Sequence, residues 1–235
     1  MWNGKKKAIT FSFDDGVEQD KRLIEIFDKY NLKCTFNLNS GLFGAKGQLT
    51  SFDGVKVEHN KISPSEIKQV YKNHEVAAHT VCHPLLTLMD KDSIVYQVEQ
   101  DRKTLSEFCG YEVQGMAYPC GGVNNDDRVA EIIKNNTSIK YVRTITSTHN
   151  FDLQTNLYRF NPTVYISEKD KLFEDGKAFL ELETDTPKLL YVWGHSYEFD
   201  FDNSWEWFEE FCKMMSGKDD IFYGTNTQVL LATNK

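Results

Sequence analysis

Short apolar runs alternate along the chain with longer stretches whose apolar residues recur at helical spacing. The run at residues 8–13 combines apolar and β-branched side chains, as is typical of a buried strand. Within residues 18–30, Leu23, Phe27 and Tyr30 then share one helix face. Similar runs predict strands at residues 34–38, 75–79, 113–118, 140–145, 188–194 and 221–223. Further helices are predicted at residues 90–109, 126–136, 168–183 and 203–216.

Two connecting segments carry their own signals. Residues 41–63 are polar and rich in glycine, and Asp53-Gly54 is a hairpin signal, so we expect an insertion or loop over one face. The sequence Ser63-Pro64-Ser65-Glu66 combines a capping serine, a proline at the first helical position and a glutamate that completes a capping box. It predicts a helix that starts at Ser63.

Repeated alternation of strands and helices implies an α/β fold with parallel strands and right-handed crossovers. A chain of 235 residues with 40% hydrophobic residues can bury a sizeable core and suits one domain. A closed (β/α) barrel fits this length, and an open doubly wound sheet is the alternative. Periodicity alone does not separate the two.

The charge balance narrows the range of partners. The chain has 27 Lys and Arg against 35 Asp and Glu, a net charge of -8, which disfavours nucleic acid as a partner. The basic run Lys5-Lys6-Lys7 is short and fits a solvated N-terminal tail. No apolar run reaches the roughly 18 residues of a membrane span, so we expect no membrane association.

The N-terminus and the cysteines bear on the compartment. No apolar signal-peptide core precedes the first strand, which predicts a cytoplasmic protein, or an extracellular one if a signal peptide has been removed. The five cysteines are odd in number and scattered, so we interpret them as free thiols in a reducing compartment.

Candidate chemistry lies where the predicted strands end. Asp14 and Asp15 follow the first strand, His79 and His83 the third, and His195 the sixth. In folds of this kind the functional groups gather at the carboxyl ends of the strands. The sequence therefore predicts that two carboxylates and three histidines converge on one rim.

His79 and His83 are four residues apart, so one helical turn would place both imidazoles on one face. With Asp15 they make three ligands and leave an open position, the pattern of a catalytic Zn²⁺ or similar divalent ion. The H-x-x-x-H spacing is common by itself, and the neighbouring aspartates are what favour a metal. By contrast, we interpret His59, His74 and His149 as surface or structural residues.

Adjacent aspartates on an extended chain point in opposite directions. One of Asp14 and Asp15 can therefore bind metal while the other faces the water as general base. The alternative is that Asp14-Asp15-Gly16 is simply a turn after a strand.

Four segments resemble motifs of the polysaccharide deacetylases, the NodB homology or family 4 carbohydrate esterase family. They are Thr10-Phe11-Ser12-Phe13-Asp14-Asp15-Gly16, His79-Thr80-Val81-Cys82-His83, Tyr118-Pro119-Cys120-Gly121 and Tyr191-Val192-Trp193-Gly194-His195. The resemblance covers residues 7–225 approximately, and the first two motifs are the most specific. It implies a distorted (β/α) barrel of seven or eight parallel strands, with residues 1–235 as a single catalytic domain.

The resemblance also implies roles. Asp14 would be the general base and His195 the general acid, and Asp15, His79 and His83 would bind the metal. Zn²⁺ is favoured, with Co²⁺, Mn²⁺ or Ni²⁺ as alternatives. The substrate would be an acetylated oligo- or polysaccharide that loses N- or O-linked acetyl groups. A hydrolase of the same fold acting on a small non-sugar amide is the alternative, and an inactive binding module is disfavoured because acid, base and ligands are all present.

The third motif departs from the family pattern. Ala117 stands where an arginine usually supports the base, and Cys120 replaces the usual tyrosine. By the resemblance, the backbone N–H of Cys120 would still help to hold the oxyanion. The family's D-x-x-D-W motif is not visible, and Trp193 replaces a leucine.

Arg143 is a candidate for the missing arginine. It lies in the apolar context Tyr-Val-Arg-Thr-Ile, so if buried it needs a carboxylate partner. One interpretation pairs Arg143 with Asp14 across the barrel. The other turns it outwards to a helix carboxylate such as Glu131.

Aromatic residues gather near the last motif and suit sugar rings. Tyr118, Trp193 and Tyr197 are the predicted substrate-binding residues. Phe199 and Trp205 fit either a sugar face or the core.

Overall fold

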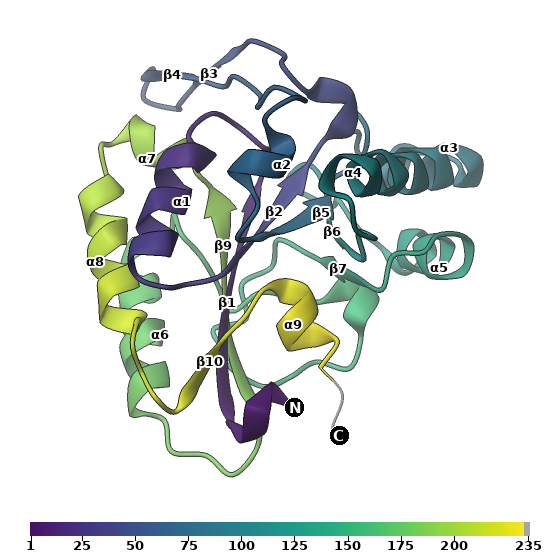
Figure 1. The fold of residues 1–235 in the computed structure, drawn as a ribbon. Coiled ribbons are helices and arrows are strands. Elements are labelled where there is room, and N and C mark those ends of the chain that lie inside the picture. Colours follow the sequence, from purple (N-terminus) through teal and green to yellow (C-terminus); the bar gives the residue numbers. More distant parts are fainter. Residues whose placement is uncertain (233–235) are drawn as a thin grey trace.

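The computed structural model describes residues 1–232, and an eight-stranded sheet curved into a distorted barrel lies at its centre (Figure 1). The strands are β1 (Lys7–Asp14), β2 (Cys34–Leu38), β5 (Glu75–Ala78), β6 (Gly115–Ala117), β7 (Tyr141–Arg143), β8 (Val164–Tyr165), β9 (Lys188–His195) and β10 (Ile221–Tyr223). They follow the order β7-β6-β5-β2-β1-β9-β8, with β10 also paired to β1, and every pairing is parallel. The predicted α/β barrel with parallel strands is confirmed.

Helices surround the sheet and bury apolar faces against it (Figure 1). They are α1 (Asp20–Lys29), α2 (Ile67–Val70), α3 (Lys91–Val95), α4 (Asp101–Cys109), α5 (Asp127–Asn136), α6 (Lys169–Glu181), α7 (Glu198–Phe201), α8 (Trp205–Met215) and α9 (Asn226–Leu230). In α8, Phe208, Phe211 and Met215 recur at helical spacing and are buried, and Phe208 packs against Phe13 of β1. No helix among residues 1–232 is long and apolar enough to cross a membrane.

The predicted helix at residues 90–109 is present as one continuous rod, α3, η4 and α4, but its middle segment η4 (Tyr96–Gln100) is a π-helical turn. A hairpin of β3 (Gln48–Thr50) and β4 (Lys56–Glu58) confirms the signal at Asp53-Gly54, where Gly54 has a φ of +85°. Short 3₁₀ segments complete the chain: η1 (Trp2–Gly4), η2 (Ser40–Leu42), η3 (Leu86–Leu88) and η5 (Leu157–Arg159).

Two expectations about local structure are wrong. The helix predicted to start at Ser63 begins at Ile67, and the Ser63 hydroxyl lies 3.0 Å from that of Ser65 instead of capping a helix. The strand β8 and the helices α7 and α9 were not predicted, because each is too short to show a period in the sequence. All five cysteines are free, as expected.

Strand register brings the predicted residues to one edge of the barrel. Asp14 of β1 is the Cα partner of His195 on β9 and of Asn37 on β2. Ala117 of β6 is likewise opposite Arg143 of β7. Because the strands are parallel, their carboxyl ends all open onto the same side.

Candidate metal and catalytic site

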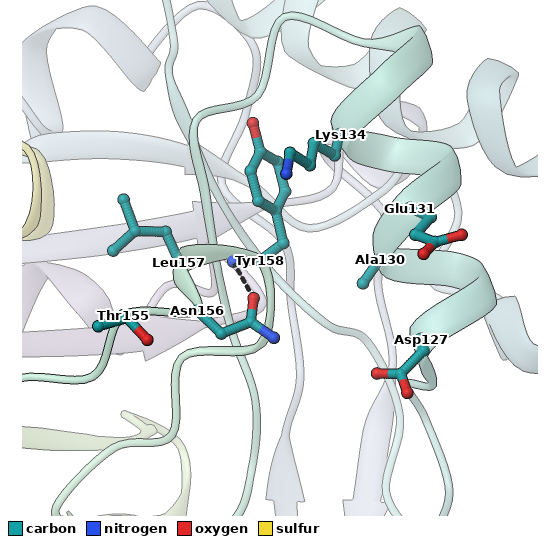
Figure 2. A pocket seen from close by; sticks show the side chains of 8 residues that line it. All are labelled: Asp127, Ala130, Glu131, Lys134, Thr155, Asn156, Leu157 and Tyr158. Atoms are coloured by element: carbon teal, nitrogen blue, oxygen red, sulfur yellow. Dashed lines mark hydrogen bonds between the residues drawn. The ribbon is translucent and has the colours of Figure 1, made fainter.

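A cavity of about 420 Å³ opens at this edge. Its lining consists of Asp14, Asp15, His79, His83, Tyr118, Cys120, Gly121, Ile145, Tyr165, Trp193, His195 and Tyr197. A second hollow of about 460 Å³ lies between α5 and the η5 segment and is lined by residues such as Asp127, Lys134 and Tyr158 (Figure 2). None of the predicted site residues lines that second hollow. The smaller cavity is therefore the candidate site.

Asp15, His79 and His83 come together as the sequence predicted. Each offers one ligand atom, and these atoms all lie within 4.8 Å of one another. Burial lowers the pKa of His79 to about 4 and also lowers the pKa of His83, so both imidazoles are neutral and able to ligate at neutral pH. One carboxylate and two neutral imidazoles are a donor set that fits Zn²⁺ and similar divalent ions.

The tautomer of His79 is fixed by its neighbour. Its Nδ1 lies 2.9 Å from the carbonyl oxygen of Ala117, which can only accept a hydrogen bond. The proton therefore sits on Nδ1, and Nε2 keeps the lone pair that a metal needs. Ala117, which stands in place of the family's arginine, therefore orients His79 through its backbone carbonyl.

The two histidines do not share a helical turn, contrary to the expectation from their spacing. Residues 79–83 form an irregular loop in which Thr80 has a φ of 68° and His83 a φ of 61°. The loop folds back so that the two rings lie 4.8 Å apart between centroids. Asn39 contributes to this shape by donating to the carbonyls of His79 and Thr80 at 2.5 and 3.0 Å.

Asp15 lies between two further basic residues that sequence reasoning did not assign to the site. Lys61 is buried and donates to the backbone carbonyl and the Oδ1 atom of Asp15 at 2.7 and 3.1 Å. His59 lies 3.3 Å from Oδ2, so of the two interpretations, surface or structural, the contact favours a structural residue beside Asp15. Burial opposes ionisation of Asp15, but His59 and Lys61 outweigh it and hold its pKa well below the ordinary value.

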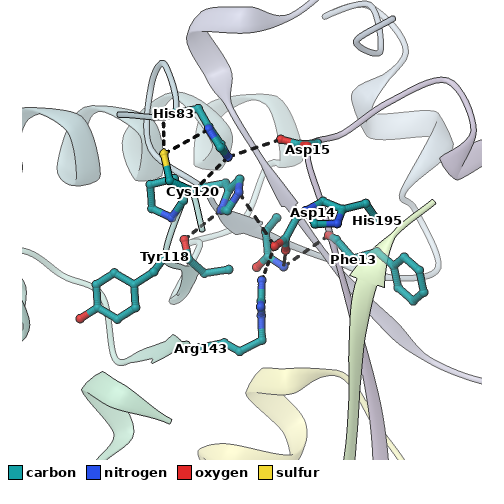
Figure 3. A network of polar contacts seen from close by, with 12 residues as sticks. Phe13, Asp14, Asp15, His83, Tyr118, Cys120, Arg143 and His195 are labelled. Atoms are coloured by element: carbon teal, nitrogen blue, oxygen red, sulfur yellow. Dashed lines mark hydrogen bonds and ion pairs between the residues drawn. The ribbon is translucent and has the colours of Figure 1, made fainter. Parts of the chain in front are cut away.

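Asp14 points away from Asp15 and towards Arg143, as Figure 3 shows. Arg143 is fully buried and pairs with Asp14 through Nη2, so the predicted contact across the barrel is present and the alternative with Glu131 is wrong. The amide of Asn37 also donates to Asp14, at 2.8 Å. The guanidinium of Arg143 lies 4.4 Å from the ring centroid of Trp193, and this ring fills the space beside it.

The charge of Asp14 follows from these contacts. Burial favours the neutral acid, but the charge of Arg143, with those of His79 and His195, outweighs burial and lowers the pKa of Asp14. Asp14 is therefore ionised at neutral pH and free of any close contact with Lys61, the partner of Asp15. It has the charge state that a general base requires.

His195 carries the opposite charge state. Burial disfavours its protonated form, but Glu198, followed by Asp15 and Asp14, raises the pKa of His195 to about 9. Glu198 Oε1 lies 3.3 Å from Nδ1, close enough for charge attraction although the angle does not suit a hydrogen bond. Glu198 Oε2 accepts the backbone N–H of His195 at 3.3 Å, and the Tyr165 hydroxyl donates to Glu198.

Cys120 lies against His83. Its backbone N–H points at His83 Nε2 at 3.4 Å, and its sulfur is 3.7 Å from Nδ1 of the same ring (Figure 3). Cys120 has a φ of 68°, so the turn after β6 bends sharply and aims this N–H at the metal ligands. The N–H is therefore directed at a ring nitrogen of the proposed ligand His83.

The aromatic residues divide into two groups. Tyr118, Trp193 and Tyr197 line the cavity. The Tyr118 hydroxyl donates to the carbonyl of Tyr158 at 2.8 Å, so this residue offers the cavity its ring rather than its hydroxyl. Phe199 and Trp205 are buried and pack on each other with centroids 4.8 Å apart, which places them in the core.

Several residues that support the site escaped the sequence analysis, among them Asn37, Glu198, Lys61 and Asp101. Asn37 could have been found because it is a polar residue in the buried run Cys-Thr-Phe-Asn-Leu, and Glu198 because it follows His195 by three residues. Lys61, and Asp101 which accepts the backbone N–H of His79 at 2.9 Å, give no comparable signal. Both lie far from the motifs in sequence.

Comparisons with known proteins identify the family and the fold. The sequence model of the family described as polysaccharide deacetylase matches residues 2–138. A bifunctional xylanase/deacetylase of Pseudobutyrivibrio xylanivorans is 27% identical over 121 residues, which are 51% of this chain and 18% of that protein. This chain therefore spans less than a fifth of that relative's length.

Solved structures share the fold. A mutant of a Bacillus anthracis CE4 family pseudoenzyme, with restored enzymatic activity, has a TM-score of 0.62 at 19% identity, covering 96% of this chain and 68% of that one. The family 4 carbohydrate esterase of Streptomyces lividans, in complex with acetate, has a TM-score of 0.57 at 12% identity, covering 94% and 92%. At these identities the likeness establishes the fold alone.

Proposed function

The chain belongs to the polysaccharide deacetylase family, and from that premise we propose that it is a metal-dependent hydrolase that removes acetyl groups from an N- or O-acetylated carbohydrate. One observation carries the proposal. An ionised carboxylate, Asp14, and a protonated imidazole, His195, are partners on neighbouring strands and line the same cavity as the Asp15, His79 and His83 cluster.

Asp15, His79 and His83 would hold the metal, with Zn²⁺ favoured over Co²⁺, Mn²⁺ or Ni²⁺. When bound, such an ion lowers the pKa of a coordinated water and polarises the acyl carbonyl. The low pKa of His79 and the Nδ1–H to Ala117 contact both leave its Nε2 free for ligation. Lys61 and His59 keep Asp15 ionised and in place.

Asp14 acts as the general base and takes a proton from the attacking water. Arg143 and Asn37 hold the two carboxylate oxygens, Oδ2 and Oδ1, so that Asp14 keeps its orientation and does not move over to become a metal ligand. Arg143 is thus a positioning residue that takes the place of the absent third-motif arginine from a different strand.

His195 acts as the general acid and protonates the leaving nitrogen or oxygen. Its raised pKa means that the imidazole carries the proton at neutral pH, and Glu198 maintains that state. The backbone N–H of Cys120 donates to His83 Nε2 in this structure, and we propose that it turns to the developing oxyanion when a metal takes that nitrogen. Each group therefore serves a different step of acyl transfer.

Tyr118, Trp193 and Tyr197 are the proposed substrate-contacting residues, since aromatic faces suit the apolar faces of sugar rings. A small non-sugar amide would fit the same catalytic groups, and only the ring contacts favour a carbohydrate. An inactive binding module is disfavoured because base, acid and all three ligands are retained. Relatives of this fold include a pseudoenzyme, so activity has to be measured directly.

The test is acetate release from a panel of N- and O-acetylated oligosaccharides and of acetylated non-sugar amines. We expect release from the oligosaccharides, its loss after chelation, and its recovery on adding Zn²⁺, Co²⁺, Mn²⁺ or Ni²⁺. Asp14→Asn should keep the metal and lose most turnover, while Asp53→Asn at the exposed hairpin tip should behave like the unaltered protein. Full activity after chelation would refute the metal, and hydrolysis of the non-sugar amides alone would favour the alternative substrate.

A further inference from the structure

The loop at residues 79–83 supplies two of the three proposed metal ligands, yet it has no regular structure to fix its shape. Thr80 and His83 both have left-handed backbone conformations, which residues with a side chain rarely adopt. Such a conformation persists only where surrounding contacts determine it. The residues that contact the loop therefore help to determine where His79 and His83 lie.

Asp101 is the first of these neighbours. It is the first residue of α4, is fully buried, and contacts the first residue of the loop. Its Oδ2 accepts the backbone N–H of His79 at 2.9 Å, and its Oδ1 accepts that of Ser40 at 2.7 Å. One side chain thus ties the end of β5, where the loop starts, to the end of β2.

Gln97 is the second neighbour, one turn earlier in the same rod. Its backbone carbonyl accepts the N–H of Val81 at 3.0 Å. Its side-chain Oε1 accepts the N–H of Cys82 at 3.1 Å, and its amide donates to the sulfur of Cys82 at 3.2 Å. The backbone N–H groups of His79, Val81 and Cys82 are therefore all held by residues of one rod.

The π-helical turn η4 lies exactly between α3 and α4 and contains Gln97. A π-turn amounts to one extra residue in the helix, and such insertions recur at functional sites. Gln97 and Asp101 are four residues apart, and residues at this spacing lie on the same face of a helix, here the face towards the loop.

We propose that Asp101 and Gln97 form a loop clamp that positions His79 and His83 to bind the metal. The clamp rests on the metal site of the proposed function. Both residues are positioning residues, because they contact the backbone of the loop rather than the metal or the substrate.

The first test is Asp101→Asn, compared with Asp92→Asn on the exposed side of α3. An asparagine keeps the shape but has one acceptor oxygen, so either His79 or Ser40 loses its contact with residue 101. The N–H of His79 would still keep the carbonyl of Leu38 at 2.9 Å. Zn²⁺ affinity is measured by competition with a chromogenic chelator, and thermal unfolding of the metal-free protein is measured beside it. We expect affinity to fall by roughly 10- to 100-fold in Asp101→Asn, with no change in Asp92→Asn.

A second pair guards against misfolding of the first variant. Gln97→Met keeps the backbone contact to Val81 and the length of the side chain but removes the acceptor for Cys82. Gln100→Met, on the exposed face of the same π-turn where the Gln100 amide donates to the Thr104 hydroxyl at 3.1 Å, is the matched control. We expect Zn²⁺ affinity to fall by about 10-fold in Gln97→Met and to stay unchanged in Gln100→Met.

The outcomes separate the clamp from the proposed function. Unchanged affinity in Gln97→Met, or in a folded Asp101→Asn, would overturn the clamp while leaving the metal site intact. An unaltered protein that binds no Zn²⁺, Co²⁺, Mn²⁺ or Ni²⁺ would overturn the proposed metal site and the clamp together. Equal losses in both members of a pair would also overturn the clamp, because the effect would not depend on contact with the loop.

Discussion

Replacement of Arg143 by methionine separates the charge of this residue from its bulk. Methionine retains an unbranched apolar side chain beside Trp193, so packing changes little, but Asp14 loses its only cation partner at hydrogen-bond distance among the described residues. Asn37 remains as a donor at 2.8 Å. The variant therefore measures how much free energy of unfolding is lost when a buried carboxylate has no counter-charge.

The expected cost follows from burial. Arg143 is fully buried and Asp14 is 2% exposed, so water screens neither charge. Breaking a buried pair by removing one partner costs about 3–5 kcal/mol, because the remaining charge stays uncompensated. The matched control is Arg159→Met, which breaks an exposed pair with Asp127 and should cost less than about 1 kcal/mol.

The lowered pKa of Asp14 determines how the free energy of unfolding changes with pH. In the unaltered protein the pKa of Asp14 is lowered, so the pair stabilises the fold above the ordinary carboxyl pKa and that stability is lost as pH falls through the lowered value. In Arg143→Met burial dominates and the pKa of Asp14 rises above its ordinary value. Protonation then relieves the variant as pH falls, so the difference in free energy of unfolding between the two proteins is largest near pH 7–8 and shrinks in acid.

The assays are urea unfolding at several pH values, the pH profile of acetate release, and metal content. We expect the acidic limb of the profile to move to higher pH, because the base must be ionised, while metal content stays unchanged. Adding Asp14→Asn to Arg143→Met should recover part of the lost stability, since a neutral amide needs no counter-charge. A variant with an unmoved acidic limb and a loss below about 1 kcal/mol at pH 7 would refute the reasoning.

Three further outcomes test other parts of the site. Glu198→Gln should move the basic limb of the pH profile to lower pH, because the raised pKa of His195 depends on Glu198, and should slow amides more than activated aryl acetates; equal slowing of both would contradict the role of His195 as acid. His83→Ala should lose the metal, shown by elemental analysis, with only a modest drop in the melting temperature. Lys61→Met should destabilise the metal-free protein by about 3 kcal/mol, because buried Asp15 loses the charge of Lys61 and keeps His59 as a partner, and Zn²⁺ should offset part of that loss in a thermal melt.

Much of the fold could be predicted because its signals are local. The run at residues 8–13 is apolar and β-branched, and in the structure it forms the fully buried β1 with strands on both sides. Helix α5 is likewise specified by residues close in sequence. Its N-cap residue Asp126 accepts the N–H of Val129 in the first turn. The two-residue strand β8 and the five-residue helix α9 carry too little pattern to be recognised.

The residues of the candidate site were visible for a related reason. Asp14, Asp15, His79, His83 and His195 all directly end or follow predicted strands, and parallel strands must open their carboxyl ends on one side. That these side chains converge could therefore be deduced from the shared direction of the strands, without coordinates. The geometry of the convergence was not, since the H-x-x-x-H spacing suggested a helical turn where the chain forms a loop.

By itself, then, the sequence determined the α/β fold with parallel strands and the set of groups gathered at the strand ends, because periodicity and strand ends are properties of neighbouring residues. The structure decided that the sheet curves into a distorted barrel. Only the tertiary structure decided between the inward and outward orientations of Arg143, since the contact with Asp14 joins positions 129 apart. It also decided that Lys61 and Asp101 hold the ligands in place, across 46 and 22 residues. Such pairs depend on strand register and on how the loops fold over the shared edge of the barrel. Neither can be read from the residues that are neighbours in the sequence.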